Sequence, residues 1–156
     1  MGGFEIGADL SFGYDTYGIR RAIETGNPWL ALDGFFVGDY SIDFDEEAAQ
    51  ITVEAGIRII DIYQAVHHRL LTLHASPTES HSSVAGAICA NVNGKDAWHH
   101  GSFAHQIVRL TFLLADGETL IIDRSHELFN AVVGGIGLLG IIVDATLQLR
   151  PIPSPY

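Results

Sequence analysis

Apolar and polar positions follow two periods along this chain. Alternation with β-branched residues is clearest over 50–54 and along the late segment 140–150, and a period of two is typical of strands. An Asp116-Gly117 pair between two apolar runs predicts a hairpin turn. The strands that we expect span 40–44, 50–54, 106–115, 119–123 and 140–150.

Helical spacing appears after the break at Ala55-Gly56. Ile57, Ile60, Tyr63 (or Gln64) and Val66 predict a helix that reaches about Leu70. The other expected segments are a charged turn at 45–47, a polar loop over 75–83, a tight helical turn or a strand over 84–90, and a short helix over 126–133. A hairpin, helices and a late strand together predict an α+β domain rather than a regular βαβ array.

Composition limits the classes of function. The 156 residues suffice for one domain with a sizeable core. A net charge of −11 with eight basic residues, and no basic run, argues against a nucleic-acid or anionic-membrane surface. The apolar run 131–143 contains four glycines and is shorter than the ~18–20 residues of a membrane span. With no targeting segment recognised, we expect a cytoplasmic protein.

The segment 82–103 carries the strongest chemical signal. Its small residues Ala85, Gly86, Ala87 and Ala90 leave little side chain above the backbone, so that a large flat ligand could lie against the main chain. The polar groups of 91–95 follow and could orient such a ligand. Lys95 is either an ordinary surface lysine or a partner for a phosphate, a flavin carbonyl or a substrate hydroxyl.

Residues 135–140 match the dinucleotide pattern G-x-G-x-x-G, which needs a strand before it and a helix after it. Here the predicted order is reversed, so we interpret the motif as a hinge between a helix and a strand. A further hypothesis is that the exposed backbone of this hinge meets a ligand.

Other catalytic classes find little support. The pairs His67-His68 and His99-His100 lack the spacing of a zinc site, and no G-x-S-x-G elbow occurs, so a metal-dependent hydrolase is only a third hypothesis. The single Cys89 excludes an internal disulfide and sits in an apolar stretch, which is typical of a small buried residue rather than a nucleophile.

Several segments in order resemble the FAD-linked oxidases, whose FAD-binding domain is of the vanillyl-alcohol oxidase / p-cresol methylhydroxylase (PCMH) type. Residues 83–96 with Gly101-Ser102-Phe103 resemble the second flavin-contacting segment of that family. The segments 52–56, 108–117, 127–129 and 134–142 resemble its neighbouring strands, turn and closing segment. The resemblance covers about 50–156, and the order of segments is like that of oxidases of the decaprenylphosphoryl-ribose oxidase type.

The resemblance implies FAD contacts, carried over position by position. The phosphate-binding loop of the family is matched at 7–14, although Ile6, Asp9 and Tyr14 depart from its pattern and a carboxylate is unfavourable in a phosphate nest. Leu10 stands where some relatives attach FAD through a His, so FAD should bind non-covalently, and Asn93 replaces another family His. The implied contacts are Ser11, Phe12, Gly13, Thr78, Ser83, Val84, Ala85, Gly86, Ala90, Asn91, Val92, Asn93 and Ile141.

The implied function is that of the FAD-binding domain of a flavin-dependent oxidoreductase, which transfers hydride from an alcohol or sugar C–H to flavin N5. Lys95 is the residue placed near the substrate. We expect a degenerate phosphate-loop region with a connecting strand (1–49), an FAD-binding subdomain (50–150) and a linker (151–156) to a missing cap domain. The first strands of the family domain are also missing, so the isolated chain should be inactive.

The alternative is a non-catalytic remnant of the same fold that serves as a binding or interaction module. This hypothesis predicts no flavin and an exposed apolar edge that drives self-association.

Overall fold

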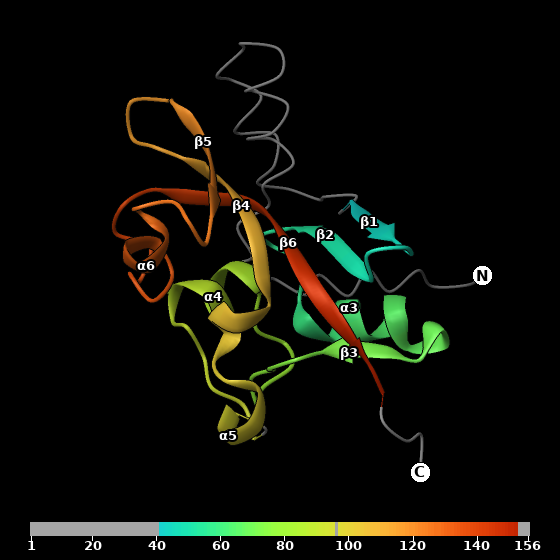
Figure 1. Ribbon diagram of the computed structural model, residues 1–156. Helices are drawn as coiled ribbons and strands as arrows, with labels where there is room; N and C mark the ends of the chain where they lie inside the picture. The colour runs from blue at the N-terminus through green and yellow to red at the C-terminus, as the bar shows by residue number, and fades with distance from the viewer. Residues whose placement is uncertain (1–40, 96, 153–156) are drawn as a thin grey trace, which may run out of the picture.

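The computed structural model describes residues 41–95 and 97–152. Within this part of the chain six strands form one antiparallel sheet in the order β1-β2-β6-β4-β5, and β3 pairs with the far end of β6 (Figure 1). The strands are β1 (Ile42–Asp45), β2 (Gln50–Glu54), β3 (Leu71–Leu73), β4 (Ile107–Leu113), β5 (Thr119–Asp123) and β6 (Ile141–Pro151).

Short helices connect these strands. The longest described helix, α3, follows β2, and α4 follows the loop after β3. The helical segments are α3 (Ile59–Val66), η1 (His67–Arg69), α4 (Val84–Cys89), α5 (Ala97–His100), η2 (Phe103–Gln106) and α6 (Phe129–Val132). The mixture of helices with an antiparallel sheet confirms the predicted α+β class.

One face of the sheet forms the core. Alternate residues of β2, β4 and β6, such as Ile51, Leu110 and Leu147, are fully buried on this face. Helices α3 and α4 contribute Ile62 and Ile88 to the same cluster. The period-two pattern seen in the sequence therefore reports the face of the sheet that packs against helices.

The opposite face of the sheet carries paired polar side chains, which the sequence did not lead us to expect. Cross-strand partners of β2 and β6 share this face because side chains alternate along each strand. Glu54 and Asp144 are both buried, and they accept hydrogen bonds from Ser41 Oγ (3.2 Å) and Thr111 Oγ1 (2.8 Å) respectively. The pairs are Gln50–Gln148, Thr52–Thr146 and Glu54–Asp144.

Helix α3 is shorter than predicted. It begins after Arg58, whose guanidinium donates to the Asp61 carboxylate at 2.9 Å, and the α-helix ends at Val66. A 3₁₀ turn continues to Arg69, and Leu70 ends the helical segment with a left-handed φ of 55°. The apolar spacing toward Leu70 thus covers an α-helix and a 3₁₀ turn together.

Three other segments differ from the sequence-based expectation. The segment 84–90, left open between strand and helix, forms α4, and the helix predicted over 126–133 is limited to α6. Strand β3 and helix α5 were not predicted, since three or four residues carry too little periodicity and β3 depends on pairing with β6. The predictions for 1–40 and for Pro153 and Pro155 lie outside the described residues.

We expect Leu147→Ala to be strongly destabilising. Leu147 is fully buried at the centre of β6, opposite Ile51 of β2 and Ile107 of β4. The substitution should lower the free energy of unfolding by about 2–5 kcal/mol, because it leaves a cavity in a packed core. Urea unfolding followed by circular dichroism measures the loss. Ile121→Ala, at an exposed position of β5, is the control, and a loss for Leu147→Ala no larger than this control would contradict the assignment.

Candidate cofactor-binding surface

Helix α4 is attached to the sheet through the loop that follows β2. The N–H of Val84 donates to Ile57 O (2.8 Å), and the N–H of Ala85 donates to Ala55 O (2.9 Å). Ala55 in turn donates its N–H to Val143 O of β6 at 3.0 Å. The N-terminal end of α4 is therefore fixed against the central strand by main-chain bonds.

The remaining donors at the start of α4 are also used within the protein. Ser83 is the N-cap, and its Oγ accepts the N–H of Gly86 at 3.1 Å. The N–H of Ala87 donates to Ser83 O at 3.0 Å. Since all four first N–H groups of the helix have protein acceptors, this helix end does not provide free donors for a phosphate.

Gly86 nevertheless leaves open main-chain surface on α4. It is exposed, and a Cβ at this position would meet Ser83 Oγ alone, at 3.2 Å. By contrast, a Cβ on Gly94 would clash with the carbonyl oxygen of Ser76, and one on Gly135 with that of Ala131. Glycine within a helix is destabilising relative to alanine, so packing gives little reason for Gly86. The surface fits a ligand that lies directly on the backbone.

The C-terminal end of α4 turns sharply at Asn91, which has a left-handed φ of 42°. Its Oδ1 accepts the N–H of Ala104 at 3.0 Å, and Val92 O accepts the N–H of Phe103 at 2.9 Å. These bonds tie α4 to η2 and engage one polar atom of each residue. The side chains of Asn93 and Lys95, which follow, are exposed.

The glycine-rich connection from α6 to β6 lies against the same helix end. Gly134 donates its N–H to Ile88 O (3.1 Å), and Ile136 donates to Cys89 O (3.0 Å). The order helix, glycine segment, strand confirms the predicted hinge and differs from a dinucleotide fingerprint. Ile141 then begins β6 opposite Leu113 and is half-buried.

The structure therefore gathers most of the described candidate residues at the two ends of α4. Ser83 to Gly86 form its first turn with the N-cap, and 90–93 follow its last turn. Ile141 is joined to this region through the hydrogen-bonded segment 134–140. Thr78 is exposed in the loop before α4 and has no hydrogen bond to another described residue. Ser11, Phe12 and Gly13 lie outside the described residues.

Cys89 has the environment of an unreactive thiol. Burial raises the pKa of the Cys89 thiol, and the N–H of Gly137 opposes this shift only in part. A thiol with a raised pKa carries little of the nucleophilic thiolate at neutral pH. This finding agrees with the interpretation of Cys89 as a small apolar residue.

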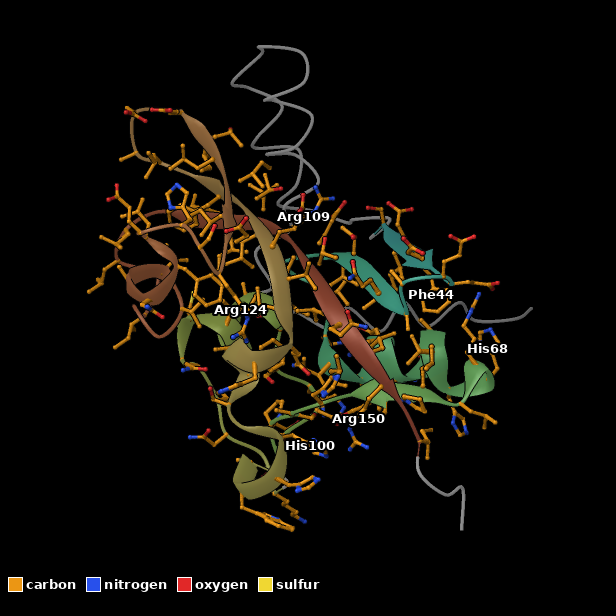
Figure 2. The ribbon with its side chains drawn as sticks, in the orientation of Figure 1. Phe44, His68, His100, Arg109, Arg124 and Arg150 are labelled. Atoms are coloured by element: carbon orange, nitrogen blue, oxygen red, sulfur yellow. The ribbon has the colours of Figure 1, made fainter. Side chains whose placement is uncertain are left out.

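Four rings form a chain from α5 toward the sheet. Trp98 and His99 have centroids 5.2 Å apart, His99 and His100 4.6 Å, and His100 and His74 5.9 Å. His100 and Arg150 lie at the same end of the molecule (Figure 2). Burial lowers the pKa of His74 below its ordinary value of 6.5, and the charges of His100 and Arg150 lower this pKa further, against a backbone hydrogen bond at Leu149.

Two searches gave negative results for residues 41–95 and 97–152. In this part of the chain no three His, Cys, Asp or Glu side chains are arranged to hold a metal ion. No described helix has both the length and the apolar character needed to cross a membrane.

The sequence did not draw attention to the apolar side chains of the glycine-rich connection. Ile136, Leu138 and Leu139 are all exposed, although large apolar residues usually find cover in a folded domain. The available signal was the combination of bulky apolar residues with closely spaced glycines in 134–140.

Comparison with known proteins identifies the family. The family model described as "FAD binding domain" matches residues 22–123. This match covers more than half of the chain, and the chain therefore belongs to the FAD-binding domain family. The resemblance to FAD-linked oxidases is confirmed, and FAD is the cofactor of this class of domain.

The relatives are oxidases by name. The chain is 41% identical over 103 residues (65% of the chain) to a D-arabinono-1,4-lactone oxidase of Yarrowia lipolytica. It is 33% identical over 125 residues (76%) to the L-gulonolactone oxidase of Mus musculus. It is 30% identical over 115 residues (72%) to the decaprenylphosphoryl-beta-D-ribose oxidase of Mycolicibacterium smegmatis. The matches span only 19%, 28% and 22% of these relatives.

Stability should fall as the pH decreases through the titration of His74. The pKa of His74 is lower in the folded than in the unfolded chain, so its contribution is complete above 6.5 and is lost as the pH falls toward the folded-state pKa. His74→Gln should therefore flatten the decline in the urea midpoint between about pH 7 and pH 5.

His67→Gln is the matched control, because His67 is exposed on η1. This control should keep the slope of the wild-type chain. An unchanged slope in His74→Gln would show that the His74 environment does not contribute to the pH dependence.

Proposed function

We propose that this chain is the cofactor-binding part of a flavin-dependent oxidoreductase that oxidises an alcohol or sugar-type substrate. Membership of the FAD-binding family and the oxidase names of the relatives support this proposal. The observation that carries it is the open main chain of α4 at Gly86, which internal packing does not require. A cytoplasmic location stays a prediction from the sequence.

The proposed FAD contacts extend along α4 and its flanking segments. The first turn offers backbone that a ligand can approach closely, and the residues after the last turn offer polar groups. The proposed contacts within the described residues are Thr78, Ser83, Val84, Ala85, Gly86, Ala90, Asn91, Val92, Asn93 and Ile141. Ser11, Phe12 and Gly13 remain the predicted phosphate contacts, in agreement with an α4 N-terminus whose donors are already used.

When bound, FAD would supply a two-electron acceptor for hydride from a substrate C–H. This chain would contribute binding and orientation. Asn91 fixes the turn that ends α4, and the exposed ammonium group of Lys95 follows four residues later and could contact a substrate oxygen. We assign no catalytic base to the described residues, and FAD would be held non-covalently.

An absorption spectrum of the purified chain tests the proposal. The chain is incubated with excess FAD, desalted by gel filtration and measured in the visible range, with circular dichroism as the check of folding. Retained flavin bands are expected, and acid precipitation should release the flavin if it is non-covalent. A folded chain that retains no flavin would overturn the proposal.

A second candidate is a non-catalytic interaction module. The edge strand β5 favours it, since Ile121 at its centre is 56% exposed. Exposed edges of this kind promote association between chains. The module predicts no flavin binding together with a concentration-dependent sedimentation coefficient that Ile121→Lys lowers.

Gly86→Leu separates a ligand surface from a structural role. Leucine is a better helix former than glycine and has open space here, so stability should stay equal or rise. The same side chain would block the main-chain surface, and the dissociation constant for FAD should rise about tenfold or more, the equivalent of one lost close contact of about 1.4 kcal/mol. Flavin fluorescence titration measures it.

Ala48→Leu, at an exposed turn between β1 and β2, is the size-matched control and should leave FAD affinity unchanged. An unchanged dissociation constant for a folded Gly86→Leu variant would remove Gly86 from the proposed site.

A further inference from the structure

The connection between α6 and β6 displays three large apolar side chains to solvent. We call residues 134–140 the apolar loop. Ile136 is 78% exposed, Leu138 85% and Leu139 47%. The loop runs from α6 to the start of the long strand β6 at one side of the molecule (Figure 1). These residues contribute little to the core, so their apolar character calls for another explanation.

The backbone of the apolar loop holds a strained conformation. Ile136 has a φ of 55°, which is rarely adopted by a β-branched residue. Its N–H donates to Cys89 O at 3.0 Å, and the N–H of Gly134 donates to Ile88 O at 3.1 Å. Strain of this kind persists where the surrounding structure imposes it, and it concentrates at ligand-binding sites.

Close packing at both ends fixes the path of the loop. A Cβ on Gly135 would clash with the carbonyl oxygen of Ala131, and one on Gly140 would clash with the carbonyl oxygen of Leu113. The loop therefore cannot turn its apolar side chains inward without moving α6 or β4. The fold presents these side chains in one place.

The apolar loop borders a shallow apolar hollow beside α4. Cys89, Phe112, Val132, Leu138 and Leu139 line this hollow. Cys89 is the last residue of α4, directly before the proposed contacts at 90–93. The loop and the proposed cofactor surface on α4 are thus joined by hydrogen bonds and are adjacent.

We propose that the apolar loop is an additional contact surface for an aromatic ring system of FAD, packed through Ile136 and Leu138. This inference rests on the proposed function. The loop contains no polar or charged side chain, so it offers no side-chain partner to the pyrophosphate, whereas apolar side chains pack well on a flat ring. Its attachment to α4 places it beside the other proposed contacts.

Leu138→Ser and Ile136→Asn test the inference by flavin fluorescence titration, with thermal unfolding measured in parallel. Each should weaken FAD binding about tenfold or more, as expected when a large apolar contact is lost. Asparagine tolerates a left-handed φ, so Ile136→Asn should keep or raise the melting temperature while it weakens binding. A purely structural loop would not show these opposite effects.

Ile121→Ser is the matched control, because Ile121 is an exposed apolar residue on β5, away from the apolar loop. Titrations of Leu138→Ser with FMN and with ADP identify the ring. A loss confined to FMN assigns the loop to the isoalloxazine, and a loss confined to ADP assigns it to the adenine.

The outcomes that overturn the inference are distinct from failure of the proposed function. If the wild-type chain binds no FAD, the proposed function fails and this inference fails with it. If the wild-type chain binds FAD and both loop variants bind it equally well, only the inference fails. Loop variants that change the sedimentation coefficient but not FAD affinity would assign the loop to association between chains instead.

Discussion

The arrangement depends on the main-chain hydrogen bonds that attach α4 to the sheet. Val143 of β6 accepts from Ala55, Ala55 accepts from Ala85, and Ile57 accepts from Val84. Because these bonds use the backbone, they fix the position of α4 while leaving its side chains free to be small. A surface of small residues can then stay in place without bulky side chains to pack it, and this is what a backbone-contacting site requires.

The same bonds have a chemical cost for phosphate recognition. The donors at the start of α4 face protein acceptors, so the helix end that would suit an anion elsewhere is closed here. The described part of the site therefore suits rings and ribityl-type hydroxyls better than a pyrophosphate. This division agrees with a separate phosphate loop in the family pattern, which the sequence matches only at 7–14.

The sequence predicted the sheet better than the site. Strands β2 and β5 match their predicted bounds because alternation and flanking turns define them locally. Strand β3 depends on the far end of β6, and no local signal records this pairing. The small residues of α4 were found from the sequence and the family resemblance. The engagement of Asn91 with Ala104 and the exposure of Ile136 depend on segments distant in the sequence and required the structure.

Charge sets a further condition on how FAD could be held. The chain has a net charge of −11, and a pyrophosphate is itself anionic, so long-range electrostatics oppose the cofactor. Lys95 is the cation that follows α4 most closely in the sequence, and one exposed ammonium group contributes little in water. Binding must then draw on contacts that do not depend on charge: close approach to the backbone at Gly86 and apolar packing of the rings. An acidic domain that binds FAD in this way should lose little affinity as salt increases, in contrast to a site that is based on lysine and arginine.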